Sequence, residues 1–281
     1  MQPNLLQRNK PIQFILLLGV AVIMLYPLLW MLSSSFKPNQ IIFTELGLWP
    51  SQITADNYVK GWQGFSGLTF SLFFRNSFVL VFFAILGNVI TCSMTAYAFA
   101  RIDFSMKKIC FAVMMGTIML PHHVVLIPQY MLFHKLDWVN TYLPLIVPKF
   151  LATDAFFIFL MVQFIRGLPL ELDNAARVDG CGPVGIFTKV IFPLLLPALV
   201  TTSIFTFIWT WNDFLSQLIY ISNPKLMTVT LALRAFMDSA GESSFGSLFA
   251  MSILSLIPIF IFFVSFQKLL IEGIATSGLK G

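Results

Sequence analysis

Charged residues are scarce in this 281-residue chain. Only 10% of it is Asp, Glu, Lys or Arg, whereas 58% is hydrophobic, and an ordinary soluble domain carries about a quarter charged residues. Such a chain cannot cover its surface with polar groups in water. The shortage of charge therefore excludes a typical soluble protein, and lipid is the expected surrounding for most of the chain.

Motifs for catalysis and for metal or nucleotide binding are also missing. The three cysteines, Cys92, Cys110 and Cys181, form neither a CxxC pair nor an even-numbered framework, so no disulfide scaffold or zinc site is expected. The chain has no GxxxxGK[ST] phosphate loop, HExxH or GxSxG. The net charge of +5 forms no basic stripe with interleaved aromatics, which argues against nucleic acid. We expect no catalytic residue and no bound metal or cofactor in this chain.

Long apolar runs are abundant, and six of them predict an all-α membrane protein with about six transmembrane helices. A cleaved signal peptide is an alternative for the first run, but that run is long for such a peptide and Ser33–Ser35 offers no A-x-A site. We interpret residues 1–281 as one transmembrane domain, with a core at about 72–272 preceded by the first span and an external segment at 1–71. The expected helices are Ile12–Leu32, Phe78–Ala98, Ile109–Ile127, Leu143–Ile165, Leu194–Asp213 and Leu248–Phe266.

Basic residues gather in alternate connecting segments. Cytoplasmic loops carry an excess of Lys and Arg, so the chain is expected to place both termini in the cytoplasm and the long segment Phe36–Ser77 outside. The basic residues that support this orientation are Arg8, Lys10, Arg101, Lys107, Lys108, Arg166, Arg177, Lys189, Lys268 and Lys280.

The connection Arg166–Lys189 has the composition of an ordered helical loop. Pro169 suits a helix start, Glu171 and Asp173 are favourable in a first turn, and Gly180 is a typical stop. A second short helix is predicted to begin near Pro183. The loop is therefore expected to form a helix, a glycine turn and another helix.

The first loop helix is expected to present a small apolar face formed by Leu170, Ala175 and Val178. Two interpretations remain open from these residues. The helix is either a knob that docks into a groove of a partner protein or an interfacial helix lying on lipid headgroups. The charged residues expected to ring this face are Asp173, Arg177 and Asp179.

The loop resembles the "EAA" loop of binding-protein-dependent ABC importer permeases, which reads Glu-Ala-Ala, then Asp-Gly, then a proline after an apolar run. Ala175-Ala176, Asp179-Gly180 and Pro193 stand at the matching spacing, and Asn174 replaces the glutamate. The resemblance extends to Trp211-Asn212-Asp213 and to the Gly273–Gly281 tail. This combination is similar to the carbohydrate branch of the family, in the second of its two permease positions.

The resemblance implies a type I ABC importer permease in a bacterial plasma (inner) membrane. The loop would be a coupling helix that sits on separate ATPase subunits, and the tail after Lys268 would be a further contact with them. The implied partners are a second homologous permease, two ATPase subunits that hold ATP and Mg, an external solute-binding protein, a sugar and membrane lipid. The implied coupling residues are Asn174, Ala175, Ala176, Arg177, Asp179, Gly180, Gly182, Phe187 and Pro193.

Polar residues inside the spans are candidates for a translocation path, because ionisable groups in lipid are costly. Interhelical hydrogen bonding or an aromatic belt is the alternative for the group near residue 211. Lys149 and Asp154 are expected to form an ion pair, with a proton pathway as the alternative. The candidate path residues are Asp154, Trp209, Trp211, Asn212 and Asp213.

Two other classes of function compete with the importer permease. An ion-coupled secondary carrier would need ionisable residues that converge at mid-membrane, and Asp154 and Lys149 are the ones at hand. An intramembrane lipid enzyme lacks its motifs. The permease hypothesis accounts for the loop, the topology and the missing phosphate loop together.

Overall fold

The computed structural model describes residues 10–240 and 245–278, and in these ranges the chain forms helices and no β-strand. Four segments are long and apolar enough to cross a membrane, and two bent helix pairs bring the number to as many as six. The predicted all-α membrane fold is therefore confirmed. The four segments are Gln13–Ser35, Phe70–Arg101, Leu143–Arg166 and Phe245–Gln267; the bent pairs are Lys107–Ile118 with His123–Lys135, and Pro183–Leu194 with Leu196–Asn212.

The chain divides into two compact units. One comprises Met1–Phe70 and Leu233–Ile257, and the other comprises Ser71–Ala232 and Pro258–Gly281. The smaller unit contains helix α1, the 3-10 helix η1, α2 and the first part of the last helix, α14. Their bounds are Lys10–Ser35, Asn39–Ile41, Asp56–Gln63 and, for the whole of α14, Phe245–Gly278.

The connection after α1 is a folded cap within the smaller unit. Lys37 is fully buried, and its Nζ donates hydrogen bonds to the carbonyl oxygens of Glu45 at 2.6 Å and Gly47 at 2.7 Å. The buried Asn57 Nδ2 donates to the carbonyls of Ser35 and Lys37, both at 2.8 Å. A buried ammonium group needs such partners, so the cap has a specific internal structure.

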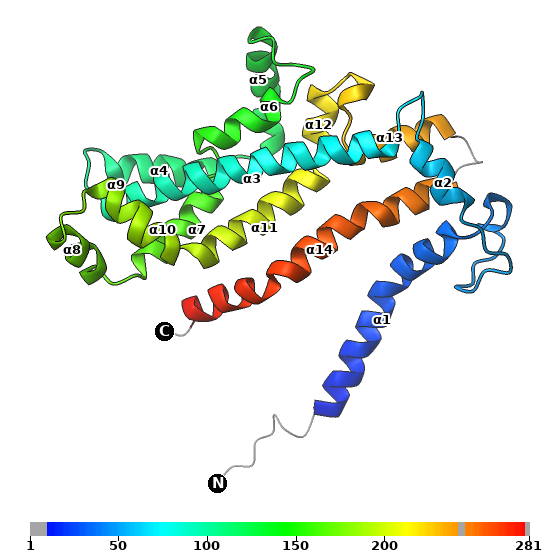
Figure 1. Ribbon diagram of the computed structural model, residues 1–281, viewed down its shortest axis with the longest axis horizontal. Coiled ribbons are helices and arrows are strands. Elements are labelled where there is room, and N and C mark those ends of the chain that lie inside the picture. The colour runs from blue at the N-terminus through cyan, green and yellow to red at the C-terminus, as the bar shows by residue number, and fades with distance from the viewer. Residues whose placement is uncertain (1–9, 241–244, 279–281) are drawn as a thin grey trace. The chain divides into compact units, whose positions relative to one another are not determined.

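The larger unit holds the helices that surround both candidate sites (Figure 1). Helices α4 and α11 pack on α7, whose buried face shares one apolar core with the second half of α3. The bounds are α3 Phe70–Arg101, α4 Lys107–Ile118, α5 His122–Lys135, α6 Leu143–Ile146, η2 Val147–Leu151, α7 Ala155–Arg166, α8 Glu171–Val178, α9 Pro183–Ile186, η3 Phe187–Ile191, α10 Phe192–Leu194, α11 Leu196–Asn212, α12 Leu215–Tyr220 and η4 Pro224–Leu226. Helix α13, Val229–Ala240, begins in the larger unit and passes into the smaller one at Leu233.

The third expected span, Ile109–Ile127, is wrong as one straight helix. The chain bends by 105° between α4 and α5, and Pro121 in extended conformation precedes α5. A proline disfavours helical backbone in the residue before it, which explains a break after Leu120. Helix α5 therefore begins anew at His122.

The fourth expected span, Leu143–Ile165, is also not one continuous helix. It consists of α6, η2 and α7, and Ala152 has a positive φ of 53° between the last two. A bend of 73° likewise separates the segment Pro183–Leu194 from α11. Breaks of this kind at membrane depth are tolerated where the freed backbone is buried in protein or lines a cavity.

Three of the four remaining spans are longer than the apolar runs indicated, whereas the fifth is shorter, because α11 covers Leu196–Asn212 of the expected Leu194–Asp213. Helix α3 begins at Phe70 instead of Phe78, so the connecting segment after α1 is shorter than Phe36–Ser77, and α1 and α14 also extend past their predicted ends. An apolar count stops at the first polar residues, whereas the helix continues through them. Residues 279–281 of the tail lie outside the described residues.

Candidate functional site

The loop between α7 and α8 leads into the expected short helix. Helix α8 carries Glu171 and Asp173 in its first turn and Arg177 in its last turn, which suits the helix dipole at both ends. Gly180 follows with φ of +80°. The Gly180 amide donates to the Arg177 carbonyl at 3.0 Å, and the Cys181 amide donates to the Ala176 carbonyl at 2.9 Å. These two bonds form a Schellman motif, which needs a left-handed residue where Gly180 stands.

The predicted apolar face of α8 is exposed. Val178 is 88% exposed and Leu170 is 58% exposed, and Ala175 is also exposed. An exposed apolar helix face of this kind fits both open interpretations, a partner protein and lipid headgroups. The polar residues of the predicted loop set that are also exposed are Asn174, Arg177 and Asp179.

Two residues of α8 face the protein's own interior. Ala176 is buried in the core that contains Tyr97, Phe99 and Ile165. Asp173 was expected on the rim of the exposed face, and that expectation is wrong: its carboxylate is buried and pairs with Arg101, with Oδ2 at 3.1 Å from Nε. Helix α8 therefore has one charged side chain, Asp173, on its buried face. The Arg101 guanidinium of α3 lies at that face and pairs with it.

The second half of the loop returns the chain toward α11. Gly182 is extended and precedes Pro183 at the start of α9, a position suited to proline. Phe187 packs on Tyr97, with ring centroids 5.3 Å apart. Pro193 stands in α10 directly after the π-helical turn η3. The loop set thus divides into an exposed part on α8 and a packed part around Phe187.

A cavity of about 840 Å³ lies among α5, η2, α11 and α12 in the larger unit. Four of the five candidate path residues line it: Asp154, Trp209, Asn212 and Asp213. The fifth, Trp211, is 3% exposed and packs on Phe78 and Phe207, with ring centroids 5.1 and 5.5 Å away. The structure therefore gathers most of the set at one hollow and places Trp211 in the packing behind it.

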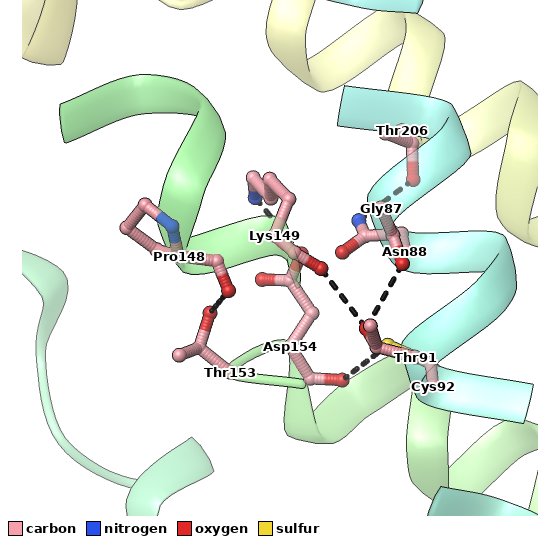
Figure 2. Close-up of polar contacts among 9 residues, drawn as sticks. All are labelled: Gly87, Asn88, Thr91, Cys92, Pro148, Lys149, Thr153, Asp154 and Thr206. Carbon is pink, nitrogen blue, oxygen red and sulfur yellow. Dashed lines mark hydrogen bonds and ion pairs between the residues drawn. The ribbon is translucent and has the colours of Figure 1, made fainter. Parts of the chain in front are cut away.

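Lys149 and Asp154 form the expected ion pair at the wall of this cavity. Their Nζ and Oδ2 atoms are 2.8 Å apart, and the side chains are 27% and 25% exposed (Figure 2). Lys149 belongs to η2, and Asp154 directly precedes α7. The two opposite charges neutralise each other. The pairing therefore lowers the free-energy cost of placing them at the wall of a cavity within the membrane.

Helix α3 holds this break by direct contact. The Thr91 hydroxyl donates to the carbonyls of Gly87 and Lys149, both at 2.9 Å, and Asn88 Nδ2 donates to Thr206 Oγ1 at 3.0 Å (Figure 2). A Cβ on Gly87 would lie 2.9 Å from the Lys149 carbonyl carbon. The glycine therefore allows η2 to approach α3 closely, and Asn88 and Thr91 hold α3 to its neighbours by hydrogen bonds between helices.

Asp213 and Asn212 are both tied to nearby backbone. Asp213 Oδ1 accepts a hydrogen bond from the Ser216 amide at 3.1 Å, at the start of α12. Asn212 Nδ2 donates to the Ile208 carbonyl at 2.8 Å. Both residues line the cavity, and each side chain has a second hydrogen-bonding atom besides the one used in these bonds.

The family model for the binding-protein-dependent transport system inner membrane component matches residues 5–275. The chain belongs to this family. It is 34% identical to the probable ABC transporter permease YurM of Bacillus subtilis (95% of this chain, 86% of the relative). It is 32% identical to the arabinooligosaccharide permease AraQ of Halalkalibacterium halodurans (93% of each), and 31% identical to the trehalose/maltose permease MalG of Thermococcus litoralis (93% and 94%).

The fold of this permease agrees with that of a solved importer. The crystal structure of a bacterial ABC transporter that imports the acidic polysaccharide alginate matches with a TM-score of 0.82 over 95% of this chain and 99% of the other, at 21% identity. A second alginate transporter structure, in complex with a periplasmic protein bound to an alginate pentasaccharide, matches at 0.63 over 94% and 96% of the chains, at 12% identity. The prediction of an importer permease is confirmed, in preference to the secondary carrier.

Sequence reasoning missed several polar residues of the permease's cavity, of which Gln129 and Tyr220 have the largest side chains. Gln129 of α5 and Tyr220 of α12 both line it, and the buried Tyr220 hydroxyl has no hydrogen-bond partner among the described residues. Burial raises the pKa of Tyr220, with the Asp213 carboxylate adding to the effect, so the hydroxyl remains a donor at neutral pH. The sequence did carry a signal for Gln129, because a single polar residue within an apolar run is a candidate for a cavity wall. Tyr220 had no such signal.

Proposed function

We propose that this permease imports a carbohydrate. It does so as one of two homologous membrane subunits that together enclose the path. An external solute-binding protein delivers the sugar, and two ATPase subunits that hold ATP and Mg drive the transport. The carbohydrate relatives and the polar lining of the cavity support this proposal. Sugars are bound by hydroxyl-pairing groups and aromatic faces, and the cavity offers both in Asn212, Tyr220 and Trp209.

The coupling role rests on one observation, the exposed apolar face of α8. This face combines Leu170, Ala175 and Val178 with the exposed polar residues Asn174, Arg177 and Asp179. A rigid helical corner of this kind fits a groove of a partner subunit. The proposed coupling loop also includes Ala176, Gly180, Gly182, Phe187 and Pro193, which hold the corner in shape.

The proposed location is the bacterial plasma membrane, with both termini and the α8 corner in the cytoplasm. The distribution of lysine and arginine among the connecting segments supports this orientation. In that orientation the corner faces the compartment that supplies ATP, and the cap after α1 faces the outside. The cavity's ionisable groups argue against an ion-coupled carrier, because Lys149 and Asp154 neutralise each other and Asp213 caps α12.

The test is copurification from a strain that expresses the complete transport operon with this chain tagged. We expect an ATPase subunit and a second permease to copurify, and we expect Val178→Asp to remove the ATPase by placing a charge in the docking face. Ile53→Asp is the matched control, since Ile53 is 78% exposed in the cap. Solute uptake by the purified chain alone under an ion gradient would contradict the proposal.

A further inference from the structure

Arg101 joins the loop helix to the longest helix of the larger unit. It is the last residue of α3, and its guanidinium makes two contacts with the loop. Nε lies 3.1 Å from Asp173 Oδ2, and Nη2 donates to the Leu168 carbonyl at 2.7 Å. One side chain therefore fastens both the entry of α8 and its first turn.

The environment of this ion pair is dry and well packed. The two side chains are 5% and 4% exposed, whereas those of the surface pair Lys107–Asp103 are 23% and 103% exposed. Tyr97 of α3 packs on Phe187 beside it, and Ala176 lies in the same core. Water screens such a pair weakly, so the link between α3 and α8 is stiff compared with a surface ion pair.

The other part of α3 contacts the cavity wall. Thr91 and Gly87 hold the Lys149 peptide of η2, and Lys149 lines the cavity. At 1.5 Å per residue, Thr91 lies about 15 Å along the helix from Arg101. No proline interrupts α3, so a displacement at Arg101 is carried to η2 by a continuous helix.

We infer that Arg101 and Asp173 are positioning residues that transmit movement of the loop helix, through α3, to the cavity wall at Lys149. This inference rests on the proposed coupling role of α8. When α8 follows the ATPase subunits, the ion pair pulls α3 with it, and α3 moves the peptide that carries Lys149.

The experiment follows cavity access instead of sugar uptake, because the sugar is unidentified. The assembled importer is placed in nanodiscs with Cys92, Cys110 and Cys181 replaced by serine and with Thr117→Cys, a cavity-lining position. The rate of labelling by a sulfonated methanethiosulfonate is measured without nucleotide and after trapping with ATP and vanadate. In the parent importer we expect trapping to change the rate by at least about fivefold, a typical size for allosteric coupling.

Asp173→Asn and Arg101→Gln are expected to abolish that change while ATP hydrolysis continues and the ATPase subunits remain bound. The double variant Arg101→Asp with Asp173→Arg exchanges the two charges and restores an ion pair at the same place. It is therefore expected to recover at least about half of the trapping-dependent change. The matched control, Asp103→Lys with Lys107→Asp, is expected to leave the change intact.

Three outcomes would contradict the inference, and one of them would also contradict the proposed function on which it rests. If the single variants retain the trapping-dependent change, the ion pair transmits nothing and the inference is wrong. If they lose bound ATPase or membrane level, and the charge exchange does not recover the change, their role is only structural and the inference is also wrong. If the parent importer itself shows no change on trapping, the proposed function fails first and the inference fails with it.

Discussion

The corner at α8 and the break at η2 are both interruptions between helices of the larger unit, but they are stabilised in different ways. The turns of the corner are set by local sequence: acidic residues in the first turn of α8, a Schellman motif at Gly180 and a proline at the start of α9. Arg101 of α3 contacts the inner face of the corner through Asp173 and the Leu168 carbonyl. The break is held from outside by Thr91 and Gly87 of α3 and by the Lys149–Asp154 pair. Because the turns of the α8 corner are local, its outer face stays free for a partner. The η2 break is covered by neighbouring helices and is open only toward the cavity.

The largest expected effect on stability comes from a comparison of two tryptophans, Trp211 in the packing behind the cavity and Trp209 at the cavity wall. Trp211→Ala removes a 3% exposed indole packed on Phe78 and Phe207, so we expect a loss of about 3–5 kcal/mol in the free energy of unfolding. Trp209 is 50% exposed, and Trp209→Ala is expected to lose about half as much or less.

Denaturant unfolding of the two detergent-solubilised variants provides the comparison, and uptake by the assembled importer is measured beside it. Trp209→Ala is expected to reduce uptake more than its stability loss explains, because Trp209 lines the cavity. Equal losses of stability in the two variants would remove the distinction between wall and packing.

The next effect concerns the bracing of the break. In Gly87→Ala the new Cβ would lie within 3.0 Å of the Lys149 backbone, and such overpacking destabilises by about 1–3 kcal/mol. Gly116→Ala is the matched control in α4, where an added Cβ meets nothing within 4 Å. That change is expected to stabilise by about 0.5–1 kcal/mol, because alanine favours a helix over glycine.

Midpoints of thermal unfolding measure both glycine variants. A Gly87→Ala protein as stable as its Gly116→Ala counterpart would mean that η2 does not depend on close contact with α3. The conclusion that the η2 break is held by α3, in contrast to the α8 corner, would then be wrong.

A smaller, local effect is expected at the corner. Gly180→Val forces a branched residue into φ of +80°, which opposes the Schellman motif by about 1–2 kcal/mol. We expect the variant to reach the membrane at the normal level but to lose at least about tenfold in ATP-driven uptake and in stimulated ATP hydrolysis. Gly47→Ala, in the cap where an added Cβ meets nothing within 4 Å, is expected to retain both activities, and a similar loss in both variants would contradict a conformational role for Gly180.

The smallest expected change in stability is at Tyr220. Its hydroxyl has no partner among the described residues, so Tyr220→Phe removes no hydrogen bond and is expected to alter the free energy of unfolding by less than about 0.5 kcal/mol. If the hydroxyl binds the transported sugar, uptake falls while unfolding stays unchanged. A clear loss of stability would show that the hydroxyl is already satisfied within the protein.

Local signals predicted the corner better than the break. Pro169, Glu171, Gly180 and Pro183 act on the backbone within a few residues, so their positions alone indicated two short helices and a glycine turn. The break near Pro148 lies inside an apolar run, and apolar counts cannot distinguish a straight span from a broken one. The same limitation led to a straight third span across Pro121, where the chain bends by 105°.

Composition alone determined that the chain is a helical membrane protein, since scarce charge and long apolar runs leave the backbone no other way to satisfy its hydrogen bonds in lipid. The loop motif determined the family, and the match over residues 5–275 agrees. Only the tertiary structure decided that Asp173 lies inward against Arg101, that Trp211 is packed away from the cavity and that Tyr220 joins its wall. These side chains are oriented by residues 70 or more positions away or on another helix, and spacing along the chain carries no record of such neighbours.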